Sequence, residues 1–205
     1  NNGYQYENLV ENKFQVAYLQ TIGTYGKWDA SKFYGDFGLY AQIGEASVTN
    51  DKVDVGAYYA GFNLGYKFTN PFKAELGFEY LSGKDQNDTD IKVKSFTPLF
   101  GTNHGFNGLM DYFYVGNHKN SVGLQDFYTK FIYDKNKWQV TFAPHLFYSA
   151  ASVYNMTTLE EQDSYLGTEI DLTATYKLDK NFVITGGVSK MFASDTMEVL
   201  KGGNN

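Results

Sequence analysis

The sequence predicts an all-β protein made of long antiparallel strands. Aromatic residues form 18% of its 205 residues and glycine is frequent, at 21, whereas proline occurs only 3 times. That balance favours strands over helices or disorder. In addition, apolar and polar residues alternate over segments much longer than the roughly five to six residues typical of strands in soluble proteins. Such length indicates strands that cross a thick layer.

Eight segments carry the alternation. They are Phe14 to Thr24, Phe33 to Ala46, Val53 to Phe68, Phe72 to Tyr80, Val122 to Tyr133, Trp138 to Tyr148, Tyr165 to Lys177 and Phe182 to Phe192. In the second segment one face carries Phe33, Phe37 and Leu39, and the other carries Tyr34, Asp36 and Gln42. Because successive side chains point to opposite faces of a strand, the first face suits lipid and the second suits water.

The segment Tyr165 to Lys177 follows the same rule. Its apolar face is predicted to hold Leu166, Ile170 and Leu172, and its polar face to hold Tyr165, Glu169 and Asp171. Charge is costly on a lipid face and tolerated on a wet one. We therefore expect lysine at Leu172 to impair folding and lysine at Glu169 to be tolerated.

Connector lengths alternate between short and long. Tight turns are predicted around residues 69–71, 134–136 and 178–180, with Lys27 to Ser31 on the same side, whereas 84–120 is a long loop. Short turns at one end and long loops at the other are typical of an antiparallel transmembrane β-barrel of the outer membrane. The long loop is expected to be either extracellular or folded inward.

Strand direction predicts how much of the barrel is present. If the tight turns are periplasmic, the first predicted strand runs downward and the last runs upward. Barrels of this type usually begin and end in the periplasm. Residues 1–205 are therefore expected to form a single barrel unit that is incomplete at both ends.

Composition excludes several classes of protein. No segment approaches the roughly 20 consecutive apolar residues of a membrane-spanning helix, and mean hydropathy is −0.42. A net charge of −6 argues against a nucleic-acid partner. The chain has no cysteine, and its three histidines, at 104, 118 and 145, lack metal-ligand spacing. We predict no metal, no cofactor and no enzymatic activity.

Two segments resemble a known family. They read FTPLFGTNHGFNGLMDYFYVGN over residues 96–117 and MEVLKGG over residues 197–203. Both are similar to the alginate-export family of outer-membrane porins. The resemblance implies the C-terminal part of a barrel of about eighteen strands in a Gram-negative outer membrane. It also implies a water-filled lumen that passes an anionic polysaccharide or related small hydrophilic solutes by diffusion.

The charged residues depart from that family, whose lumen is associated with arginine. All seventeen basic residues here are lysines. The charges predicted to face inward are Asp36, Lys67, Lys73, Glu75, Glu79, Lys130, Glu169, Asp171 and Lys177. They form either solvated cross-strand pairs or a selectivity constriction. The substrate and its charge stay open.

The long loop supplies a second set of candidates. Asn107, Asp111 and Asn117 could contact a sugar, and Tyr112 and Tyr114 could stack on one. The apolar residues among them suit an inward-folded constriction or plug, or else a cap on the rim that meets another envelope protein.

Three functions follow from these patterns. The first is a passive outer-membrane pore. The second is a structural or interaction subunit of an envelope complex, with its barrel plugged by the loop. The third, a secreted β-sandwich that binds glycans, fits the long two-faced strands poorly.

Overall fold

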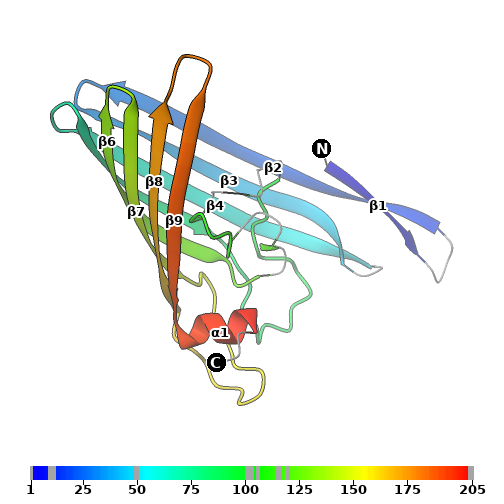
Figure 1. Ribbon diagram of the computed structural model, residues 1–205. Helices are drawn as coiled ribbons and strands as arrows, with labels where there is room; N and C mark the ends of the chain where they lie inside the picture. The colour runs from blue at the N-terminus through cyan, green and yellow to red at the C-terminus, as the bar shows by residue number, and fades with distance from the viewer. Residues whose placement is uncertain are drawn as a thin grey trace.

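The computed structural model describes residues 2–8, 13–48, 51–99, 104, 107–113, 117–118 and 121–202. They form one antiparallel sheet of nine strands, each paired with its neighbours in chain order (Figure 1). The elements are β1 (Asn2–Asn8), β2 (Lys13–Ala30), β3 (Phe33–Val48), β4 (Asp51–Lys67), β5 (Phe72–Leu81), β6 (Leu124–Lys135), β7 (Trp138–Tyr148), β8 (Tyr165–Lys177), β9 (Val183–Ala193) and α1 (Asp195–Lys201). The all-β prediction is confirmed.

The eight expected strands are β2 to β9, and β1 is an addition. β1 pairs with the first part of β2, from Lys13 to Leu19. β2 also runs on to Ala30, because its last residues pair with Phe33 to Gly38 of β3. The connection expected over Lys27 to Ser31 is therefore the two-residue turn Ser31-Lys32, in which Ser31 has a φ of 53°. Positive φ is what tight hairpin turns require.

Short turns and long connectors lie at opposite ends of the sheet. Figure 1 shows the turns at the top and the long connectors with α1 at the bottom. We call residues 82–123 the β5–β6 connector. The strands curve around it, so that the sheet has an inner face toward the connector and an outer face away from it. In the part of the chain described, no helix is long and apolar enough to cross a membrane.

The core lies between the inner face and the connector. Strand residues Val55, Leu81 and Phe147 pack there with Phe96 and Phe113 of the connector. Met197 of α1 joins the same cluster. Large apolar side chains on the outer face are instead exposed. They include Phe33, Phe37, Leu39, Phe62, Leu76, Phe131, Phe142, Leu172 and Val188.

One predicted face is wrong at the start of β8. The register of β7 with β8 shifts by one residue, because Tyr148 pairs with Tyr165 and Phe147 with Gly167. A β-bulge adds one residue to one strand and reverses the alternation beyond it. Leu166 is consequently buried in the core, whereas the Tyr165 ring packs against Tyr148 at 5.4 Å on the outer face.

Candidate functional site

Five ionisable side chains meet on the inner face near the middle of the sheet. This acidic cluster consists of Glu79 of β5, Asp126 of β6, His145 of β7, and Glu169 and Asp171 of β8. The strands are consecutive in the sheet, so alternate positions on each bring these side chains together. All but Glu79 are buried, and Glu169 is 0% exposed. The expectation that lysine at Glu169 is tolerated assumed a solvated side chain, and that premise is wrong.

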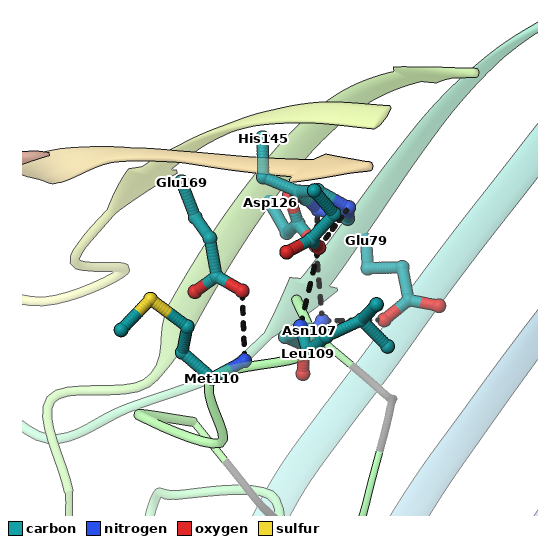
Figure 2. Close-up of polar contacts among 8 residues, drawn as sticks. Glu79, Asn107, Leu109, Met110, Asp126, His145 and Glu169 are labelled. Atoms are coloured by element: carbon teal, nitrogen blue, oxygen red, sulfur yellow. Dashed lines mark hydrogen bonds and ion pairs between the residues drawn. The ribbon is translucent and has the colours of Figure 1, made fainter. Parts of the chain in front are cut away.

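The tip of the β5–β6 connector donates hydrogen bonds to this cluster (Figure 2). The Asn107 side-chain amide donates to Glu79 Oε2 at 2.8 Å and to Asp126 Oδ2 at 3.3 Å. Backbone N–H groups of Leu109 and Met110 donate to Asp171 Oδ2 at 3.2 Å and to Glu169 Oε1 at 2.8 Å. Hydrogen bonds to carboxylates are stronger than neutral ones. The carboxylates therefore hold the connector on the inner face.

Gly108 permits this close approach. Its φ is +77°, and a Cβ built on it would lie 2.5 Å from Glu169 Oε1. A larger residue would meet both the strain of positive φ and the carboxylate.

His145 lies between two carboxylates of the cluster. Its Nδ1 is 3.0 Å from both Asp126 oxygens, and its Nε2 is 4.0 Å from Asp171 Oδ2. Glu169 Oε2 and Asp171 Oδ1 are buried without a hydrogen-bond partner among the described residues. Within those same residues, no group of three or more His, Asp or Glu side chains has the arrangement of a metal site.

Other inward charges pair locally, nearer the tight turns. Lys67 forms an ion pair with Asp29 at 2.6 Å, and Lys73 lies 3.8 Å from Asp134. Glu75 accepts a hydrogen bond from the Tyr34 hydroxyl at 2.9 Å. Three predicted inward residues remain. Lys130 Nζ lies 4.8 Å from the centre of the Tyr128 ring, and Asp36 lines a cavity. Lys177 is exposed at the end of β8. The predicted set therefore divides into charges with local partners near the turns, an acidic group beneath the connector, and three residues, Asp36, Lys130 and Lys177, that belong to neither.

Of the loop candidates, Asn107 donates hydrogen bonds to the acidic cluster, whereas Asp111, Tyr112 and Asn117 have hydrogen-bond partners outside it. Asn117 donates to the backbone oxygen of Tyr112 at 2.7 Å, and Asp111 Oδ2 lies 2.7 Å from His104 Nδ1. Tyr114 lies outside the described residues.

Helix α1 fastens the connector from the other side. Ser194 caps the helix by accepting a hydrogen bond from the Met197 N–H, and Gly202 ends it in a left-handed conformation. Lys201 Nζ donates to the backbone oxygen of Tyr112 at 2.8 Å and lies 5.3 Å from the centre of the Phe113 ring. The connector is thus held by carboxylates at its tip and by α1 near residues 112–113.

His118 makes this docking sensitive to pH. Burial, aided by the positive charge of Lys201, lowers the pKa of His118 to about 4, although a hydrogen bond with the Phe113 oxygen partly opposes the shift. A histidine in water has a pKa of about 6.5. Between these values an opened connector binds a proton that the docked one does not, so docking stability falls as pH falls.

We expect connector amides to exchange hydrogen faster at pH 5 than at pH 7, after correction for intrinsic rates. At pH 5 the lowered pKa of His118 should reduce the stability of the docked connector by roughly 2 kcal/mol. Mass spectrometry of the region 107–113 measures the exchange. His118→Gln keeps a hydrogen-bond donor but does not titrate, so its pH dependence should be weaker. An unchanged dependence in this variant would show that other groups, such as the acidic cluster, govern it.

A cavity of about 450 Å³ lies beside the acidic cluster, between the connector and strands β2 to β6. Tyrosines from four strands line it: Tyr25, Tyr40, Tyr59 and Tyr128. Sequence reasoning did not select them, nor Asp126 and His145. Alternation places five of these six on the polar face, and Tyr25 lies one residue beyond the predicted segment Phe14 to Thr24, so the inward tyrosines carried a usable signal.

No protein-family model matches the chain. No curated protein matches it at a significant level. Function is therefore argued from the geometry.

Proposed function

We propose that the sheet is part of the wall of a β-barrel in the outer membrane of a Gram-negative bacterium, and that the protein is a passive pore for hydrophilic solutes. The observation that carries this proposal is the pattern of the outer face. Two rows of aromatic side chains flank an apolar band there. Aromatic girdles at both interfaces are typical of outer-membrane barrels.

One row follows the tight-turn end. It contains Phe33, Tyr66, Phe68, Phe72, Tyr133, Trp138 and Tyr176, with ring centroids 4.9 Å apart for Phe33 and Tyr66 and 4.7 Å apart for Trp138 and Tyr176. The other row follows the loop end. It contains Tyr18, Tyr58, Tyr80, Tyr148, Tyr165 and Phe192, in which Tyr58 and Tyr80 stack at 5.5 Å.

The separation of the rows fits a bilayer. Tyr58 to Tyr66 covers nine residues of β4, and Trp138 to Tyr148 covers the eleven residues of β7. A tilted transmembrane strand needs about 9–11 residues. Leu39, Leu64, Leu76 and Leu172 are among the side chains that fill the band between the rows.

The edges of the sheet support closure by further strands. β1 and β9 are the two edges, and they do not pair with each other. Unpaired backbone groups are costly in lipid, so a membrane sheet must close. We propose a larger barrel, of about eighteen strands as the resemblance implies, that conducts polysaccharide or smaller hydrophilic solutes as alginate-export porins do.

A second function is favoured by the docked connector. The β5–β6 connector covers the inner face and is anchored there by four hydrogen bonds from Asn107, Leu109 and Met110. If it closes the lumen, the protein is a structural or interaction subunit that meets other envelope proteins.

Single-channel conductance of the purified protein in planar bilayers tests the two functions. We expect open channels, with ion selectivity read from the reversal potential under a salt gradient. Anion preference would support a polyanion such as alginate, whereas cation preference would exclude a dominant electropositive lumen. A folded, inserted protein that does not conduct would overturn the pore and favour the plugged subunit.

A further inference from the structure

The four tyrosines of the cavity come from β2, β3, β4 and β6 on the inner face. Tyr40 and Tyr59 are direct partners on β3 and β4, with ring centroids 5.9 Å apart. Tyr25 pairs with Gly38 on β3 and is 59% exposed. Tyr128 lies on the far side, stacked on His145 at 5.3 Å. The cavity is thus lined by aromatic rings from β2 to β6.

Glycines on neighbouring strands let the rings lie against the sheet. A Cβ on Gly23 would be 2.1 Å from Cδ1 of Tyr40, and a Cβ on Gly77 would be 2.0 Å from Cζ of Tyr128. The rings of Tyr40 and Tyr128 therefore cover backbone at positions where a side chain would otherwise stand. The Tyr128 ring is also stacked on His145 and Tyr59 packs against Phe96, so Tyr25, 59% exposed, offers the most accessible ring of the four. Flat apolar faces of this kind suit the C–H faces of a sugar ring.

Hydrogen-bonding groups stand between the rings. Asp36, Asn63, Glu79 and Asn107 line the cavity, and Asn63 Oδ1 is buried with no hydrogen-bond partner among the described residues. Carboxylate and amide oxygens accept hydrogen bonds from hydroxyl groups. An unsatisfied buried oxygen is costly, so a ligand hydroxyl that reaches it would be stabilised.

The carboxylates that line the cavity give it negative charge that no lysine in its described lining offsets. Its described lining contains two carboxylates, of Asp36 and Glu79, and no lysine. A uronic acid carboxylate placed here would face like charges in a partly desolvated space, which disfavours it. Neutral sugars meet no such repulsion.

We propose that this cavity binds a neutral pyranose unit of an oligosaccharide and discriminates against uronates. The inference rests on the proposed pore, because a solute reaches the cavity through the lumen. A volume of about 450 Å³ lies within the range of small-ligand sites. This substrate class is neutral, whereas the family resemblance led us to expect alginate, which is anionic.

Binding is measured by titration calorimetry on the purified protein in detergent. The probes are maltotriose, cellotriose and xylotriose as neutral trisaccharides and trigalacturonate as the anionic one. At least one neutral probe should bind more tightly than trigalacturonate. Tyr25→Leu removes a π face but keeps apolar bulk at an exposed position, and should weaken that binding about two- to tenfold.

Tyr18→Leu is the matched control. Tyr18 lies on the same strand, is 53% exposed and faces outward, so its substitution should leave affinity unchanged. Asp36→Asn should narrow the preference against trigalacturonate, because it removes one of the two carboxylates. Equal affinity for neutral and anionic probes, or no effect of Tyr25→Leu, would overturn the inference.

Conductance separates this inference from the proposed function. Open channels without neutral-sugar binding would leave the pore standing and remove its proposed ligand class. Saccharide binding by a folded protein that does not conduct would remove the pore and keep the cavity's preference for neutral sugars.

Discussion

Lysine in place of Leu172 should lower the stability of the bilayer-inserted protein by about 2–4 kcal/mol. Leu172 lies in the middle of β8 on the outer face, 43% exposed, between Phe142 of β7 and Val188 of β9. A charge there would sit in the apolar band between the two aromatic rows. Urea unfolding in lipid vesicles, followed by gel mobility of the folded form, measures the loss.

Thr173→Lys is the control for this variant. Thr173 is the next residue of the same strand, faces inward, and lines a second cavity together with Lys130. The charge of a lysine side chain at this inward position can stay hydrated, so the stability of the inserted protein should change little. Equal losses in the two variants would contradict the assignment of the outer face to lipid. Glu169 cannot serve as this control, because it is buried and accepts a hydrogen bond from Met110.

Alternation predicted the faces of most of the sheet, because the side-chain period of a strand is two whatever its partner. It failed at Leu166, since a bulge depends on how β8 pairs with Phe147 and Tyr148 of β7. It also did not select β1, where only Tyr4 and Tyr6 alternate with polar residues in the seven-residue segment NGYQYEN. Both features depend on a neighbouring strand rather than on the local sequence.

Only the residues of the candidate site that lie on strands could be predicted from the sequence. Alternation places Glu79, Glu169 and Asp171 inward, and the same rule applied to β6 and β7 would have added Asp126 and His145. The match of Asn107 to Glu79 joins residues 28 positions apart, across a connector whose described residues form no helix or strand of the sheet. No local pattern encodes such a contact. The choice between an inward and an outward connector therefore required the structure.

Alanine at Gly108 should release the tip of the β5–β6 connector. The left-handed conformation alone costs a non-glycine residue about 1–2 kcal/mol. The added Cβ would also meet the Glu169 carboxylate at 2.5 Å, and Glu169 is packed and hydrogen-bonded to the Met110 N–H. The tip should therefore leave the acidic cluster. We expect faster protease cleavage and faster hydrogen exchange over residues 107–113, and a higher single-channel conductance if the connector narrows a pore.

Gly202→Ala is the control that separates the backbone strain of positive φ from the collision with the Glu169 carboxylate. Gly202 has a φ of +71° at the end of α1, with no atom within 4 Å of a built Cβ, so the variant shares the strain of Gly108→Ala but not its collision. Because Lys201, next to Gly202, holds Tyr112, the two variants are compared at the tip, residues 107–110. Equal loosening there would make backbone strain the cause and not the carboxylate contact. If only Gly108→Ala loosened these residues, Glu169 would be identified as the group that holds the tip. Higher conductance in that variant would then show that the docked connector narrows the open pore, whereas a released tip without conductance would place the closure elsewhere in the barrel.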